Sequence, residues 1–180
     1  MDTGRSMFWD DLAQDLKDPQ FLREYVAQSI RIGTIDRIVI LATFLPVLSS
    51  QAGNTGCQAL AVTVRGITLG DVKEGHGSEL TWKEGLLGLA NGTVTGSLCG
   101  IAMYMYAASQ GSPHAPMLGL VIMLAMIGSC CVSGISGALV PLALKRFGAD
   151  PATASSIIVT TATDVSSMGL MLALATMLVH

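Results

Sequence analysis

Long apolar runs separated by short polar stretches dominate the sequence, and their lengths predict helices that cross a membrane. The runs lie at about residues 37–65, 85–108, 117–144 and 152–179. Because a helix rises about 1.5 Å per residue and a hydrocarbon core is about 30 Å thick, roughly 20 apolar residues suffice for one span. We therefore expect an all-α integral membrane protein, with a bundle of four transmembrane helices per chain.

Residues 1–33 are polar and acidic by contrast. Apolar side chains recur there at helical spacing, at Phe21, Leu22, Tyr25, Val26 and Ile30. This spacing predicts an amphipathic helix over about 20–32 that lies on the membrane surface, with a disordered or locally helical tail as the alternative. The stretch has no apolar core typical of a cleavable signal. The expected organisation is a tail at 1–33 and a transmembrane domain at 34–180.

A polar segment interrupts the first apolar run. It contains Pro46 and then Ala52-Gly53-Asn54-Thr55-Gly56-Cys57-Gln58. Freed backbone groups and buried amides cost free energy in hydrocarbon unless something satisfies them. We predict a first helix interrupted at this Pro/Gly-Asn elbow, which faces a water-filled path or an ion. The alternative is a kink packed against neighbouring helices.

Composition supports the membrane assignment and excludes several classes. The chain is 51% hydrophobic and 13% charged, and a soluble domain carries about twice that share of charge. No basic patch indicates nucleic acid as a partner. The four cysteines lie within the apolar runs without a CxxC pair, which favours a role as small hydrophobes. No His/Cys cluster, Ser-His pair or Walker-type loop supports an enzyme.

Basic residues predict the orientation. The polar loop expected at 66–84, with Arg65, and the turn at 145–150 hold five of the ten Lys and Arg residues, while the loop at 109–116 holds none. The positive-inside rule places the first two in the cytoplasm and both termini outside. Of the other five basic residues, four lie in the amino-terminal tail and the fifth, Arg37, directly follows it, against this orientation.

Glycines repeat every fourth residue along the second run. Gly88, Gly92, Gly96 and Gly100 share one helix face, and a face without Cβ atoms lets another helix approach closely. We interpret this ladder as a packing surface.

Asp164 is the one charged residue of the last run. A charge at the centre of a span costs at least ~2.5 kcal/mol, so such a carboxylate is a functional candidate. Hydroxyl residues share its helix face, at Ser156, Thr160, Thr161 and Ser167. The alternative is a protonated Asp164 hydrogen-bonded to a neighbouring helix.

Oxygen ligands suit hard cations, and Mg²⁺ keeps several of its waters beside one or two carboxylates. One Asp164 is too little charge for a divalent ion, whereas two chains around a two-fold axis would supply two. This predicts a homodimer with the ion path along its axis. A membrane potential of ~100 mV, negative inside, would favour inward movement of Mg²⁺ by roughly 4.6 kcal/mol.

These residues resemble the MgtE-type magnesium transporter family. Pro46 and the segment Ala52 to Gln58 resemble its proline-then-GGNxGxQ signature. Asp150-Pro151-Ala152 and Thr160-Thr161-Ala162-Thr163-Asp164-Val165 resemble its last-helix pattern. The resemblance covers about residue 35 to the C-terminus.

The resemblance implies a homodimeric, Mg²⁺-permeable channel or transporter in the cell inner membrane, with its pore between the subunits. Asp164 would be the pore carboxylate, facing hydrated Mg²⁺ beside the Asn54 elbow, and Asp150 would hold a regulatory Mg²⁺ at the cytoplasmic mouth. Mg²⁺ is thus expected as the transported ion and as a regulatory ligand. The predicted metal-contacting residues are Asp164, Asn54, Thr160, Thr161, Gly53, Gln58 and Asp150.

The sequence departs from the family pattern in several places. Ala52 replaces the first glycine, Ile157 stands where a proline is common, and the family's first span and sensor domains are not recognisable. The chain is then a natural minimal form, one part of a transporter with a separate regulatory or first-span subunit, or a truncated reading frame. Two other functions stay open: a proton- or sodium-coupled carrier that uses Asp164, and a non-transporting membrane scaffold held by the glycine ladder.

Overall fold

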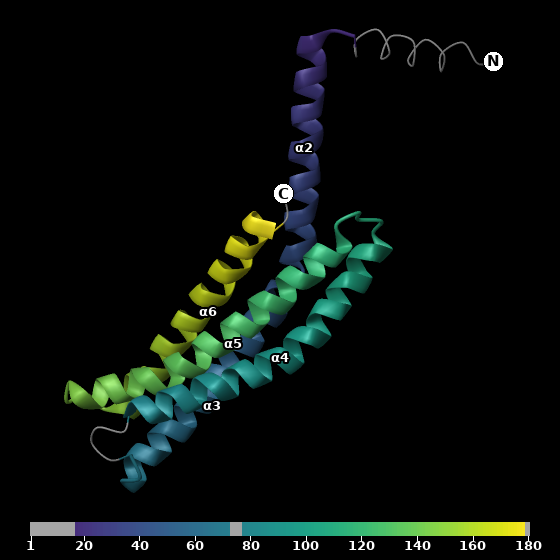
Figure 1. The fold of residues 1–180 in the computed structure, drawn as a ribbon. Helices are drawn as coiled ribbons and strands as arrows, with labels where there is room; N and C mark the ends of the chain where they lie inside the picture. Colours follow the sequence, from purple (N-terminus) through teal and green to yellow (C-terminus); the bar gives the residue numbers. More distant parts are fainter. Residues whose placement is uncertain (1–16, 73–76, 179–180) are drawn as a thin grey trace. The chain divides into compact units, whose positions relative to one another are not determined.

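The computed structural model describes residues 17–72 and 77–178, and the regular secondary structure in these ranges is α-helical (Figure 1). The helices are α2 (Pro19–Ala42), α3 (Leu45–Leu69), α4 (Gly77–Ser109), α5 (Ala115–Arg146) and α6 (Pro151–Leu178). In the described ranges, four stretches are long and apolar enough to cross a membrane: Arg37–Leu69, Gly77–Ser109, Ala115–Arg146 and Ser156–Leu178. The predicted all-α class with four spans is confirmed.

The chain divides into two compact units, with the boundary between Val39 and Ile40, within α2. In the first unit, the carboxylate of Asp18 accepts a hydrogen bond from the backbone N–H of Gln20 at 2.9 Å, next to the start of α2. The rings of Phe21 and Tyr25 stack with centroids 6.3 Å apart. The helix expected over 20–32 is therefore confirmed as part of α2. Its location on a membrane surface stays a prediction, as does a domain boundary at residue 33.

Helix α5 is the centre of the second unit. In Figure 1 it lies between α4 and α6, and α3 packs against it as well. Of the most apolar 18 residues of α5, 56% are buried inside the chain, against 22–28% for the corresponding stretches of the other three spans. Side chains on the outer faces, such as Leu98 and Met105 of α4, are apolar and exposed. Such a surface suits lipid rather than water.

The glycine ladder is the contact surface between α4 and α5. A Cβ atom built on Gly88 would lie 2.3 Å from the carbonyl oxygen of Cys130. Helix α5 contributes a glycine of its own to this contact, because a Cβ on Gly134 would lie 2.3 Å from the carbonyl oxygen of Glu84. The two backbones therefore touch, and the packing role predicted for the ladder is confirmed.

The interruption of the first span lies earlier than the predicted elbow. Helix α2 ends at Ala42, and α3 begins at Leu45, with Pro46 in its first turn. Pro46 has no N–H to donate to the preceding turn, and its ring hinders continuation of a helix through it. The segment from Ala52 to Gln58 is helical throughout. The proline part of the prediction thus holds, and the part that broke the helix at Gly53-Asn54 is wrong.

The polar loop predicted at 66–84 is also shorter than expected. Helix α3 continues to Leu69 and is capped by Gly70, whose φ of 73° is the left-handed conformation that glycine adopts readily. Helix α4 begins at Gly77, so Lys83 and Glu84 are helical residues. Charges near the membrane boundary were read as loop, although helix ends tolerate them well.

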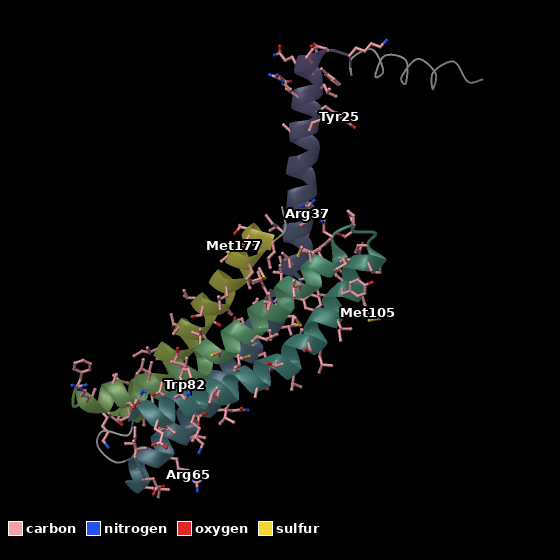
Figure 2. All side chains as sticks on the ribbon, viewed as in Figure 1. Tyr25, Arg37, Arg65, Trp82, Met105 and Met177 are labelled. Atoms are coloured by element: carbon pink, nitrogen blue, oxygen red, sulfur yellow. The ribbon has the colours of Figure 1, made fainter. Side chains whose placement is uncertain are left out.

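Consecutive spans run in opposite directions, and this order decides at which end of the second unit the charged residues of each span lie. Arg65 and Trp82 lie toward one end of the second unit, and Met105 and Met177 toward the other (Figure 2). Arg146, the last residue of α5, belongs to the end of Arg65, because α3 and α5 both finish there. The basic residues of α3, α4 and α5 therefore share one end, as the loop charges predicted. Its cytoplasmic location stays a prediction.

The glycine contacts predict that Gly88→Leu strongly destabilises the second unit. The new side chain would meet the α5 backbone, which cannot give way as a flexible side chain can. The measurement is the apparent melting temperature of purified protein in detergent. Gly169→Leu is the matched control, since a Cβ there has nothing within 4 Å. Equal melting temperatures for both variants would contradict the packing role of Gly88.

Candidate functional site

Asp164 is tied to the broken first span. It lies on α6, and its carboxylate accepts a hydrogen bond from the hydroxyl of Ser49 on α3, 115 residues away in the chain. The Asp164 side chain is exposed on the surface of the isolated chain, and Ser49 is half-buried. A carboxylate thus projects from the outer surface where α3 and α6 meet.

The hydroxyl stripe around Asp164 divides into two parts. Thr160 and Thr161 are exposed, and their hydroxyls donate to the carbonyl oxygens of Ser156 and Ile157, respectively, one turn earlier. Ser167 is fully buried. Because the threonine protons are used by the backbone, their oxygens keep lone pairs for a cation or its waters. The exposed part of the stripe therefore offers oxygen acceptors beside Asp164.

Gly56 allows α3 and α6 to cross closely enough for this contact. A Cβ on Gly56 would lie 3.0 Å from Val159 Cγ1 and 3.1 Å from Thr163 Cγ2. Helix α5 adds Gly137, where a Cβ would lie 2.4 Å from the carbonyl oxygen of Gly56. Gly53 differs, because a Cβ there meets nothing within 4 Å. The two signature glycines thus have separate roles, and only Gly56 is required by packing within the chain.

Asn54 and Gln58 lie on another part of α3. Both are exposed and line a pocket of about 410 Å³ together with Asn91 of α4. The Asn91 amide donates a hydrogen bond of 2.8 Å to the hydroxyl of Thr55. That hydroxyl donates in turn to the carbonyl oxygen of Gln51 at 3.0 Å. Asn91 therefore links α4 to the signature segment.

The predicted metal-contacting residues thus form two groups within one chain. Asp164 lies beside Thr160 and Thr161 on α6, and it contacts Ser49 of α3. Asn54 and Gln58 line the pocket shared with α4. Their assignment to a metal stays a prediction.

Asp150 stands at the start of α6. One of its carboxylate oxygens accepts the N–H of Ala152 at 2.9 Å, which caps the helix. Asp150 is exposed and follows the basic end of α5. A carboxylate next to a helix N-terminus interacts favourably with the helix dipole, so Asp150 has a structural role. Its regulatory role stays a prediction.

The residues of the described ranges do not form a protein-only metal cage. No group of three or more His, Cys, Asp or Glu side chains converges there. A dehydrated Zn²⁺ site would need such a group. Mg²⁺ retains its waters and is contacted by few carboxylates, so single acidic groups among hydroxyls and amides fit it better.

Known proteins place these features in one family. The model of the MgtE family, described as divalent cation transporter, matches residues 45–174. The chain belongs to the MgtE family. The match contains Ser49, the signature segment and Asp164, so the family's region includes both groups of candidate residues.

The chain is similar to three bacterial proteins named magnesium transporter MgtE. It is 36% identical to that of Enterococcus faecalis over 129 residues, which is 72% of this chain and 27% of the relative. It is 30% identical to that of Bacillus subtilis and 28% identical to that of Thermus thermophilus, over 81% of this chain and 31% of each relative. The chain spans less than a third of the length of these relatives.

Sequence reasoning missed the role of Ser49 in this site. Ser49 was part of the polar segment, but a serine inside a helix carries no signal for a partner 115 residues away. A lone intramembrane carboxylate does call for a hydrogen-bond donor, and the apolar α6 offers mainly hydroxyls that already serve its own backbone. A search for a donor on the interrupted span could therefore have suggested Ser49.

The Ser49–Asp164 contact predicts energetic coupling between α3 and α6. A double-mutant cycle of Ser49→Ala and Asp164→Ala should give a coupling of about 0.6 kcal/mol, and at most ~1.7 kcal/mol, the range for hydrogen bonds between membrane helices. Unfolding in mixed micelles of increasing SDS fraction measures it. The control cycle uses Ser50→Ala, an exposed neighbour. Equal coupling for Ser49 and Ser50 would contradict the contact.

Proposed function

We propose that this chain is the membrane part of a Mg²⁺ transporter, in which hydrated Mg²⁺ moves inward through a pore at a homodimer interface. The observation that carries the proposal is the exposed Asp164, held by Ser49 where α3 meets α6. Family membership and the names of the relatives support Mg²⁺ as the ion. The expected location is the cell inner membrane.

The exposure of Asp164 supports a second copy of the chain. An ionised side chain facing lipid near the middle of a span costs at least ~2.5 kcal/mol, and such groups almost always face a protein interior or water. A second chain packed on the outer face of α3 and α6 would enclose the carboxylate in a polar seam. Two-fold symmetry would place two Asp164 side chains there, which matches the charge of one Mg²⁺.

The exposed threonines suit the same seam. Thr160 and Thr161 present oxygens whose protons serve the backbone. Water molecules of a hydrated ion donate hydrogen bonds, so acceptors are the groups they require. The ion would then pass without losing its inner waters, which Mg²⁺ gives up reluctantly.

Asp164→Asn is expected to abolish Mg²⁺ uptake. The change removes the charge at nearly equal volume and keeps an oxygen that can accept from Ser49, so the fold should persist. The measurement is Mg²⁺ flux into liposomes that contain the purified chain, with an imposed inside-negative potential. Glu24→Gln, an exposed position of α2, is the control and should transport like the parent chain. Full uptake by Asp164→Asn would refute the proposal, and flux that needs a proton or sodium gradient would favour the coupled carrier.

The homodimer predicts a particle of twice the chain mass of 18.7 kDa. Light scattering of the purified protein, corrected for bound detergent, measures this mass directly. Asp164→Asn should not dissociate the dimer, because it removes the repulsion between two carboxylates. A monomer that transports Mg²⁺ would contradict the placement of the pore between subunits.

A further inference from the structure

Glu84 is a second carboxylate with an unusual environment. It lies seven residues after the start of α4, which is about 10 Å along the helix axis. Its side chain is only 7% exposed. Within the described ranges, no side chain donates a hydrogen bond to it or forms a salt bridge with it. Acidic side chains are almost never buried in this way unless they are paired or bind a cation.

Glu84 lines a pocket of about 300 Å³ between α3 and α4. The two helices pack mainly on α5 and contact each other little, which leaves room between them. Gly134 of α5 lines the same pocket, and its lack of a side chain holds the α4 backbone close at Glu84. The backbone of Glu84 is therefore held in place beside an open space.

The other polar groups of this pocket are suited to a cation. Asn91 and Gln58 line it together with Glu84, and no lysine or arginine does. Since the Asn91 nitrogen donates to Thr55 at 2.8 Å, the Asn91 carbonyl oxygen is left to accept. Carboxylate and amide oxygens are the ligands that hard cations prefer. The charge of Lys83, the preceding residue of α4, acts on Glu84, but Lys83 lines the neighbouring pocket rather than this one.

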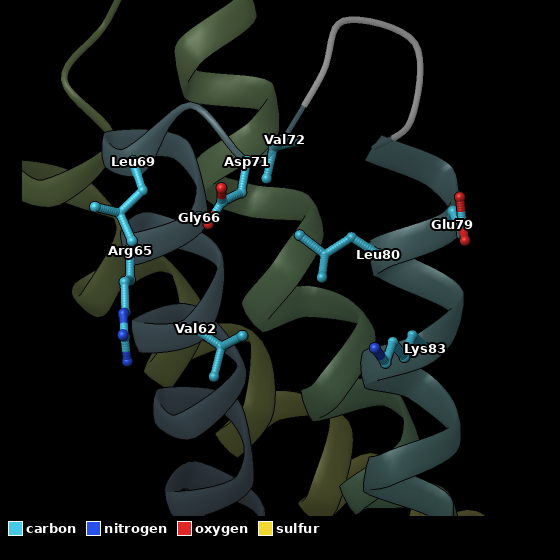
Figure 3. Close-up of a pocket in the computed structure, with 9 residues that line it drawn as sticks. All are labelled: Val62, Arg65, Gly66, Leu69, Asp71, Val72, Glu79, Leu80 and Lys83. Carbon is cyan, nitrogen blue, oxygen red and sulfur yellow. The ribbon is translucent and has the colours of Figure 1, made fainter.

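The pocket adjoins two others along the same pair of helices. It shares Thr55, Gln58 and Asn91 with the pocket of Asn54. It shares Val62 with a pocket of about 580 Å³ near the charged end of the unit. Figure 3 shows Val62 of α3, and Leu80 and Lys83 of α4, extending into the space between the two helices there. Glu84 thus lies between the polar middle of α3 and the basic end of the bundle.

We propose that Glu84, together with the amide oxygens of Asn91 and Gln58, binds a hydrated divalent cation at a site separate from Asp164. Six waters occupy about 180 Å³ at ~30 Å³ each, which the pocket accommodates. Direct contact with one carboxylate and two amides would leave an octahedral ion about three of its six waters, and Mg²⁺ in proteins usually keeps several. The choice of Mg²⁺ as the ion rests on the proposed function, whereas the site itself rests on the pocket.

Mg²⁺ binding to the purified chain in nanodiscs tests the site without relying on transport. Isothermal titration should show a binding event that Glu84→Gln weakens at least tenfold and that Asp164→Asn preserves. Asn91→Leu should weaken the same event, because it removes the carbonyl oxygen and keeps a similar volume. Glu79→Gln is the matched control, since Glu79 is an exposed carboxylate one to two turns earlier on α4.

Thermal unfolding with and without Mg²⁺ guards against a variant that simply misfolds. A ligand that binds the folded state raises the melting temperature, so the parent chain and Glu79→Gln should gain stability with Mg²⁺. Glu84→Gln should fold like the parent without Mg²⁺, because glutamine has nearly the same volume as glutamate, and should lose most of the gain. Equal binding and an equal gain for Glu84→Gln would overturn the proposal. Loss of flux in Asp164→Asn alongside that result would leave the proposed function standing.

Discussion

Contact between helix backbones is the constraint on which the rest of this structure depends. Lipid offers helices no hydrophobic gain on association, so packing must come from close approach. Helix α5 meets α4 at Gly88 and Gly134 and meets α3 at Gly137. Each of these positions lacks room for a Cβ atom. The glycines therefore fix where the polar groups of α3, α4 and α6 lie relative to each other.

The same contacts position both carboxylates. Gly56 lets α3 approach α6, and this approach brings Ser49 to Asp164. Gly134 lets α5 approach the Glu84 carbonyl, and this approach fixes the Glu84 side chain beside the α3–α4 pocket. A chain with few charges in its spans thus places two of them through residues that have no side chain. A substitution at Gly56 or Gly134 would therefore disturb both the helix packing and the position of a carboxylate.

The sequence allowed the spans to be predicted, because hydropathy over some 20 residues is a strong signal. The ladder's role followed from the regular spacing of Gly88 to Gly100. The ends of the helices were harder to predict. The charges around Glu84 predict a loop, whereas α4 begins seven residues earlier. Likewise, Gly53 and Gly56 on either side of Asn54 predict a break, although Gly56 serves a helix crossing. Contacts such as Ser49–Asp164 depend on helix rotation, which a single sequence does not fix.

Helix α3 is polar on more than one face, and this limits what can surround it. Ser49 points toward α6, while Asn54 and Gln58 line the pocket toward α4. If lipid covered α3 on its α6 side, the Ser49–Asp164 contact would face hydrocarbon; if lipid covered its α4 side, the amides of Asn54 and Gln58 would. Each unsatisfied polar group there costs several kcal/mol. One chain covers α3 mainly where it packs on α5 and α6. The proposed dimer would cover the seam at Asp164, and bound cation and water would satisfy the groove at Glu84. The two proposals thus answer the same physical requirement on opposite flanks of one helix.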